Sequence, residues 1–332
     1  MALNVAIATT PTAVALAPNN HNYSNLTLAH VHANRLADAR ATVHEWSRVV
    51  GDTRSIHQAR FLVSFLADDR EGLQRHAAAV AEEPETARLL TMSAEAAAAH
   101  GEVRRARTLF QRAADAAARL GLHETAANTF GIAAVWDAEL GDCGSARRRL
   151  QHGRSGPTGM ASAVLELATL AICNGEASTD RRLTISGTQT RVAPHVRARA
   201  LLHDGKASEA LALLTPQGPA DFYGPLGGTL AGQSHGLAGA WVRGLAYLNA
   251  GASEKAALEF ERILENPGIA PLAPYHALAP LRLAQAALAM RDFPRARAAC
   301  TTFRSRWRAA DRDVPVWRVA LTTCDRVLTE RR

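Results

Sequence analysis

Apolar and polar positions follow a regular pattern between residues 240 and 267. The stretch AWVRGLAYLNAG at 240–251 places apolar residues at helical spacing and ends at a glycine. The stretch ASEKAALEFERILENP at 252–267 repeats this pattern and ends at a proline. Apolar residues at this period predict amphipathic helices, and Gly and Pro commonly end them. We therefore predict two antiparallel helices here.

The sizes of the apolar residues predict how these two helices cross. Gly244 and Ala256 are small enough to let the helices approach closely, while Tyr247, Phe260 and Ile263 fill the space between and beyond them. This order of small and aromatic residues resembles the tetratricopeptide repeat, a helix pair of about 34 residues. The resemblance implies an all-α, right-handed superhelical solenoid of antiparallel helix pairs.

The same template fits other parts of the chain. The small position of the first helix falls at Thr27, Phe61, Ala94, Ala134, Ala168, Ala198, Gly244 and Ala284. The small position of the second helix falls at Ala39, Ala106, Ala146, Ala210, Ala256 and Ala296, and it fails at Leu73 and Asp180. We predict eight helix pairs, of which the second and the fifth match least, and a capping helix from Pro315 to about Thr329.

Three segments depart from the template. Residues 1–20 are interpreted as a degenerate or truncated upstream repeat, with Pro11 inside a poor helix. Residues 176–194 lack an apolar stripe, so the second helix of the fifth pair is in doubt. Residues 215–239 hold seven Gly and three Pro, and so long a loop is either an inter-repeat connection or a binding loop. The repeats then occupy residues 21–214 and, with the capping helix, residues 240–332.

Composition supports a helical protein. The chain has 332 residues, 69 of them Ala, and 47% are hydrophobic, which suffices for a large core. Runs of alternating β-branched and aromatic residues are missing, which disfavours all-β and parallel α/β folds. The net charge is +7, but the basic groups near Arg105, Arg148 and Arg306 are interleaved with apolar positions. We interpret them as solvated helix faces and do not expect nucleic-acid binding.

The cysteines and histidines suggest no site of their own. Cys143, Cys173, Cys300 and Cys324 are far apart in sequence without a Cys-x-x-Cys motif, which predicts neither a zinc site nor a disulfide framework. The apolar stretch at 2–17 lacks the positive region of a signal peptide, and no run is long enough to span a membrane. We expect a cytoplasmic protein.

The sequence contains the first residues of some catalytic motifs but not the residues that complete them. Lys206 is followed by Ala207 instead of the Ser or Thr of a phosphate-binding loop. The His-Glu pairs at residues 44–45 and 123–124 lack the second histidine of a zinc protease. We expect no enzyme activity, no cofactor and no metal.

A second resemblance concerns the arrangement of the repeats from about Asn22 to the end. It is similar to the C-terminal repeat region of bacterial, notably acidobacterial-type, signalling proteins, in which a serine/threonine kinase or winged-helix domain precedes the repeats. The stretches that carry it are AWVRGLAYLNAG at 240–251, ALEFERIL at 257–264, YHALAP at 275–280 and WRAADRDVP at 307–315, with LHETAA at 122–127 and GKASEA at 205–210. Neither domain is present in this chain, so the catalytic and DNA-reading residues of that family have no positions here.

The tetratricopeptide resemblance also implies a binding surface, because the first helix of each pair lines the concave face of the solenoid. The polar or aromatic residues at the positions facing this groove are Arg88, Asn128, Glu139, His195, Arg199, His203, Trp241, Asn249 and Gln285. Each could instead be ordinary surface, and Trp241 could pack beneath residues 215–239. Lys206 and Lys255 face away from the groove, which disfavours an adaptor that grips a partner's C-terminal carboxylate.

These patterns predict a non-catalytic protein-interaction module that binds a peptide or partner protein in its concave groove. The alternative is a detached or truncated regulatory region of a bacterial serine/threonine kinase or winged-helix transcription regulator. The partner and the oligomeric state are unknown from the sequence.

Overall fold

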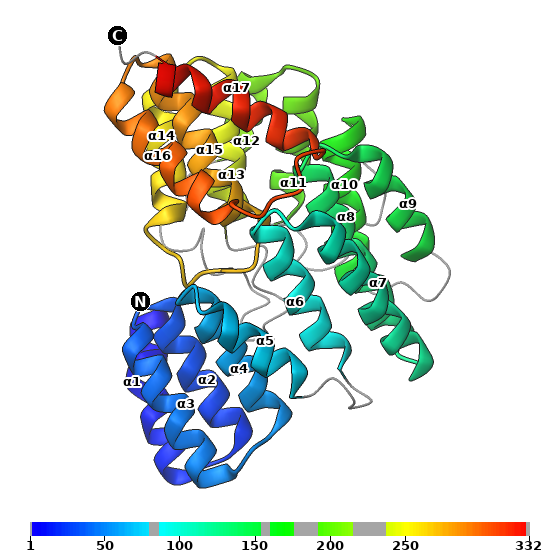
Figure 1. The fold of residues 1–332 in the computed structure, drawn as a ribbon, viewed down its shortest axis with the longest axis vertical. Helices are drawn as coiled ribbons and strands as arrows, with labels where there is room; N and C mark the ends of the chain where they lie inside the picture. Colours follow the sequence, from blue (N-terminus) through cyan, green and yellow to red (C-terminus); the bar gives the residue numbers. More distant parts are fainter. Residues whose placement is uncertain (1, 80–85, 154–159, 176–191, 215–236, 330–332) are drawn as a thin grey trace.

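The computed structural model describes residues 2–79, 86–153, 160–175, 192–214 and 237–329. Every regular element in these ranges is an α-helix, which confirms the all-α class (Figure 1). The helices are α1 (Ala2–Leu16), α2 (Asn20–His32), α3 (Leu36–Val50), α4 (Arg54–Leu66), α5 (Arg70–Ala78), α6 (Ala87–Ala99), α7 (Val103–Arg119), α8 (His123–Glu139), α9 (Cys143–Gly153), α10 (Met160–Asn174), α11 (Val192–His203), α12 (Ala207–Leu213), α13 (Ala238–Asn249), α14 (Ser253–Leu264), α15 (Pro274–Ala289), α16 (Phe293–Arg306) and α17 (Pro315–Thr329).

Each helix packs against the next one along the chain, from α1 on α2 to α17 on α16. Seven of the predicted pairs appear as two successive helices, beginning with α2 and α3 and ending with α15 and α16. The fifth pair has its first helix, α10, whereas its uncertain second helix falls mainly in residues 176–191, outside the described residues. Helix α17 has the bounds predicted for the capping helix.

The small positions of the template are buried at the helix crossings. A Cβ atom added at Gly244 would lie 2.6 Å from Cε1 of Phe260, so α13 and α14 approach as closely as their sequence predicts. In the two weakest pairs the buried position is displaced by one residue. Thr169 is fully buried where the template has Ala168, and Gly72 is buried where it has Leu73. The shift explains the mismatch at Leu73, whereas the mismatch of the fifth pair, at Asp180, lies outside the described residues.

Helix α1 forms where the sequence predicts a poor N-terminal helix. It runs through Pro11 without a break and packs on α2, where Val14 joins a cluster around Tyr23 and Trp46. Pro11 is exposed on the surface of this helix.

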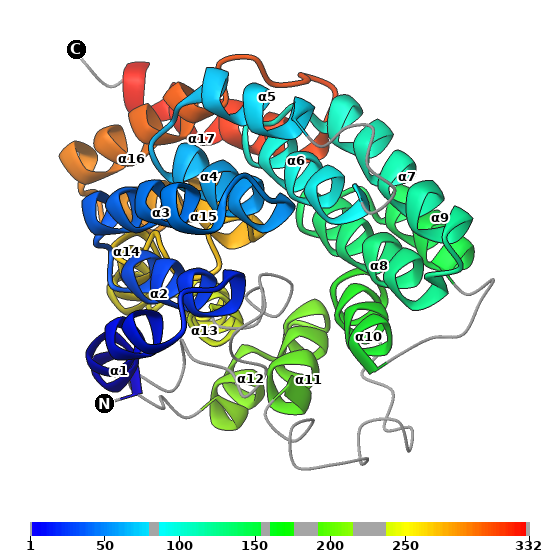
Figure 2. The ribbon, with the colours of Figure 1, turned by 90° about the horizontal axis from the view of Figure 1, so that it is seen from below.

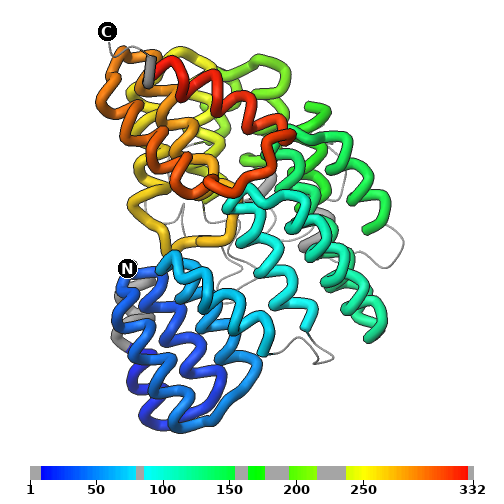
Figure 3. The backbone as a smooth tube through the Cα atoms, viewed as in Figure 1, coloured from blue at the N-terminus to red at the C-terminus, as the bar shows by residue number. Residues whose placement is uncertain are grey.

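The helix pairs follow one another around the molecule, so that the second half of the chain returns to the first (Figures 2 and 3). Asn34, after α2, accepts a hydrogen bond from the Gly268 amide at 3.1 Å. The Asp311 amide donates to Gly101 O at 3.0 Å. Repeats of a simple solenoid contact only their neighbours. Here, in addition, contacts between distant pairs hold the arrangement.

Several arginines expected on solvated faces are instead paired with acids of the next helices. Asp137, which is 3% exposed, accepts from Arg107 at 2.7 Å and from Arg149 at 2.9 Å. Arg107 also pairs with Asp142 at 2.6 Å. The stacking of α7, α8 and α9 brings these charges together, and a charge pattern along one helix does not reveal it.

The expectation of no disulfides is wrong. Cys143 is bonded to Cys173, which joins α9 to α10, and Cys300 is bonded to Cys324, which joins α16 to α17. Their separations of 30 and 24 residues reflect the distance between positions on adjacent helices, so distance in sequence concealed their proximity in space.

Within the described ranges, no helix has both the length and the apolar character needed to cross a membrane.

Candidate functional site

The nine residues predicted for the concave groove all lie on first helices of the pairs: α6, α8, α11, α13 and α15. Their exposure differs. Glu139 and Trp241 are buried, His203 and Asn249 are exposed, and the remaining five are half-buried.

Three of the nine meet in the interior. Trp241 Nε1 donates a hydrogen bond to Glu139 Oε1 at 3.1 Å, and an Arg199 guanidinium nitrogen lies 3.5 Å from Glu139 Oε2. These side chains come from α13, α8 and α11. Trp241 is 0% exposed, and its ring packs 5.7 Å from Phe260 and 5.5 Å from Tyr275, centre to centre. The indole is therefore part of the core.

Two further groups complete this interior cluster. Burial, reinforced by the Glu139 charge, raises the pKa of the Tyr275 hydroxyl, which stays protonated at neutral pH. Burial lowers the pKa of the Arg282 guanidinium. The positive charge of Arg199 lowers this pKa further, whereas the negative charge of Glu139 raises it. The Glu139 carboxylate thus accepts hydrogen bonds from the Trp241 indole and the Arg199 guanidinium, and it acts on Arg282 through its charge. The arrangement links the inner helices, and Glu139 and Trp241 already satisfy each other.

Of the other predicted residues, Gln285 reaches the cluster through Arg282, and the rest have separate roles. Gln285 accepts from Arg282 at 3.0 Å, and His203 Nδ1 lies 3.2 Å from Ile172 O of α10. Burial lowers the pKa of Arg88, and the facing Glu95 opposes that shift. His195 is half-buried near the start of α11 and interacts with another residue. No hydrogen bond of the described residues joins Asn128 or Asn249 to the interior cluster. The structure therefore brings together Glu139, Arg199 and Trp241 directly and adds Gln285 through Arg282, which makes four of the nine predicted residues.

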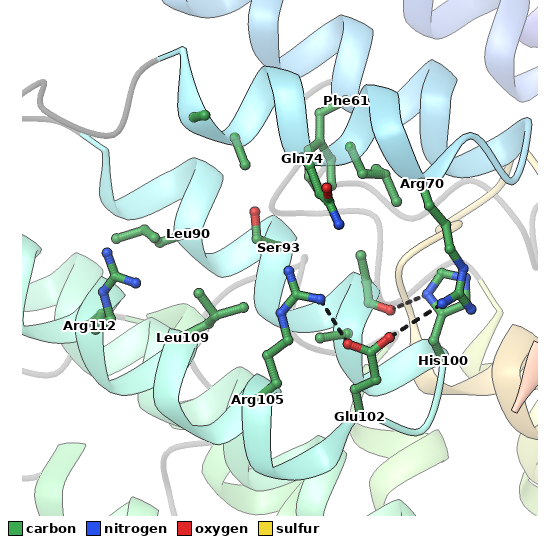
Figure 4. A pocket seen from close by; sticks show the side chains of 15 residues that line it. Phe61, Arg70, Gln74, Leu90, Ser93, His100, Glu102, Arg105, Leu109 and Arg112 are labelled. Atoms are coloured by element: carbon green, nitrogen blue, oxygen red, sulfur yellow. Dashed lines mark hydrogen bonds and ion pairs between the residues drawn. The ribbon is translucent and has the colours of Figure 1, made fainter. Parts of the chain in front are cut away.

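An accessible groove lies elsewhere, between α5 and α7 with α6 as its floor (Figure 4). Its cavity has a volume of about 260 Å³. Helix α7 packs closely along α6, whereas α5 touches α6 at few positions, so a strip of α6 stays uncovered. The apolar lining includes Leu73 from α5, Leu90 and Ala97 from α6, and Leu109 from α7.

Arginines border this groove. Arg70 and Arg105, from opposite sides, share Glu102 at 3.6 and 2.8 Å, while Arg112 lies further along α7 with no ion pair in the described part of the chain (Figure 4). In the floor, Ser93 Oγ is buried and makes no hydrogen bond to a described residue. The groove thus combines an apolar strip, an unpaired cation and an unused hydroxyl.

Sequence reasoning missed this groove because it considered only first-helix positions. The signal was present in α7, where Glu102, Arg105, Leu109 and Arg112 recur at helical spacing and form one stripe. Leu109 on that stripe breaks the polar pattern of an ordinary solvated face. The depth of the groove depends on the separation between α5 and α7, which no local sequence pattern predicts.

No group of three or more His, Cys, Asp or Glu side chains that could hold a metal ion occurs among the described residues. Comparison with known proteins adds no family: no protein-family model matches the chain, and no curated protein matches it.

Proposed function

We propose that this chain is a non-catalytic protein-interaction module built from tetratricopeptide-type helix pairs in a right-handed superhelical solenoid. The small residues buried at the helix crossings, with Gly244 against Phe260, support this assignment. The observation that carries the function is the groove between α5 and α7, because an open apolar strip on a folded chain is typical of a protein-binding surface.

The groove fits an amphipathic helix with acidic residues. From Glu102 to Arg112 the α7 side spans about 15 Å, the length of nearly three helical turns. Leu73, Leu90 and Leu109 supply apolar contacts for side chains that lie one turn apart on a bound helix. The small side chain of Ala97 in the floor leaves space for these side chains. Arg112, which forms no ion pair with a described residue, would pair with a carboxylate of the partner.

The interior cluster is a poorer place for a partner. A peptide bound against Trp241 would have to replace its hydrogen bond to Glu139 and its ring contacts with Phe260 and Tyr275. Breaking a buried charge-assisted hydrogen bond costs about 1.5–3 kcal/mol before any contact is gained. We therefore place the partner in the outer groove instead of against the predicted concave anchor.

Selection from a displayed library of amphipathic helical peptides tests this proposal. Enriched peptides should carry apolar residues three or four apart and an excess of Asp and Glu. Fluorescence anisotropy should then show at least tenfold weaker binding for Arg112→Glu, and unchanged binding for Arg119→Glu, an exposed arginine on the same helix outside the groove.

A second pair of variants tests the apolar strip. Leu109→Asp should abolish binding, whereas Leu258→Asp, at a leucine that is 58% exposed on α14, should not. Failure to enrich acidic helices, or equal binding by the members of each pair, would exclude the groove as the partner site. Because Arg112 is exposed and unpaired, its variant folds whatever the outcome for Leu109.

The regulatory alternative concerns the context of the chain. An in-frame kinase or winged-helix segment immediately upstream of the coding sequence for Met1 would favour the regulatory alternative. In that case the groove would bind the regulatory partner.

A further inference from the structure

A second cavity lies where the second half of the chain meets the first. It has a volume of about 370 Å³. One side comes from the ends of α4 and α6, and the other from α15, α16 and the connection that precedes α15. In Figure 1 this connection reaches the first helices, where Gly268 is bonded to Asn34. The volume falls in the range of small-molecule sites.

Two arginines enter this cavity without a carboxylate of their own. Arg306 donates to the backbone oxygen of His276 at 2.8 Å, its one hydrogen bond among the described residues, and burial lowers its pKa. Arg308 is exposed at the mouth and makes no ion pair with a described residue. Each guanidinium offers five N–H donors, so most of these donors are unused.

The other titratable groups of the cavity offset the charge of the two arginines only in part, although the negative charge of Asp68 raises the pKa of Arg306 against the effect of burial. Asp68 is the acid of the lining, and it lies 3.6 Å from His100 Nε2. His276 donates through Nε2 to Ile269 O at 2.8 Å, and burial lowers its pKa to about 4, so the ring is neutral at pH 7. The cavity is therefore electropositive, with an apolar wall that includes Phe65 and Pro271.

We propose that this cavity binds a small organic anion, whose carboxylate or phosphate group is held by Arg306 and Arg308 while its carbon skeleton lies against Phe65. Guanidinium groups bind such anions through paired N–H donors, which gives both strength and orientation. Since the walls come from both halves of the chain, a bound anion stabilises the contact between them and raises the stability of the folded protein.

Calorimetric titration with sodium succinate and with sodium pyrophosphate tests the site, with sodium chloride at equal ionic strength as the reference. We expect saturable binding of at least one probe, and the two probes distinguish a carboxylate from a phosphate ligand. Arg308→Gln should weaken this binding at least tenfold. Arg318→Gln, which removes the same charge from an exposed, unpaired position on α17, should leave it unchanged.

Equal affinities of these two variants would overturn the proposal, as would the absence of saturable binding for both probes. The test is independent of the peptide groove, because Arg112→Glu lies outside this cavity and should not change the affinity for the anion.

Discussion

Trp241 on α13 donates its indole hydrogen to Glu139 on α8 across 3.1 Å, although 102 residues separate them. The bond joins two helix pairs that are not neighbours along the chain. It also explains why an aromatic residue at a groove-facing position of the template is buried: the turn of the helix pairs brings another first helix against it.

Trp241→Ala should destabilise the fold by about 3–5 kcal/mol, because it removes a fully buried indole and leaves Glu139 without this donor. Trp241→Phe keeps most of the packing and should cost less. Urea unfolding followed by circular dichroism measures both values. A melting midpoint that stays at the wild-type value for Trp241→Ala would show that the ring is not in the core.

Gly244→Leu should destabilise the protein by about 3 kcal/mol or more, since even a Cβ atom there would lie 2.6 Å from the Phe260 ring. The control is Ala250→Leu, at an exposed position just after the same helix. Thermal melts compare the melting midpoints of the two variants with that of the wild type. If both melt like the wild type, the helix pair does not cross at Gly244.

Much of the fold could be predicted from the sequence because its helix pairs are local. Gly244 and Phe260 are 16 residues apart, and their sizes alone indicate the crossing. The displaced buried positions at Thr169 and Gly72 show the limit of the template, since a shift of one residue turns a position by about 100° around the helix axis. Proximity between distant pairs, as at Gly268 and Asn34, depends on the accumulated turn of the helices, and no local pattern contains it.

The two disulfides predict that the native oxidised chain has no reactive thiol. Alkylation under denaturing conditions should label four cysteines only after reduction. Replacing Cys300 and Cys324 by Ala should cost about 3 kcal/mol, because the loop that they close is then unconstrained in the unfolded chain. Four labelled thiols without reductant would contradict the pairing and would favour the cytoplasmic location expected from the sequence, whereas stable disulfides favour an oxidising compartment.

Glu95 should make stability depend on pH. Burial raises the pKa of its carboxyl to about 8, against the lowering effect of Arg88. Between the ordinary carboxyl pKa near 4.5 and about 8, the folded chain holds a proton that the unfolded chain has lost, so this group's contribution to stability falls as the pH rises through that window.

Glu95→Gln should remove that dependence and should be more stable than the wild type at pH 8.5. Chemical unfolding at pH 5, 7 and 8.5 provides the comparison. Parallel pH profiles for the two proteins would mean that Glu95 is ionised in the folded state.

The candidate site was less predictable than the fold. The template groups Glu139, Arg199 and Trp241 on one face, but it cannot indicate that Glu139 accepts a hydrogen bond from each of the other two. The groove at Leu109 and Arg112 depends on how far α5 lies from α7, and this distance is set by packing around the whole arrangement.

Amide hydrogen exchange with and without a selected acidic helical peptide tests the central claim most directly. The groove account predicts that the peptide slows exchange in α5, α6 and α7, including the turn around Leu109, and leaves α11 and α13 unchanged. Slower exchange in α11 and α13 around Trp241, with no change in α5 to α7, would contradict it.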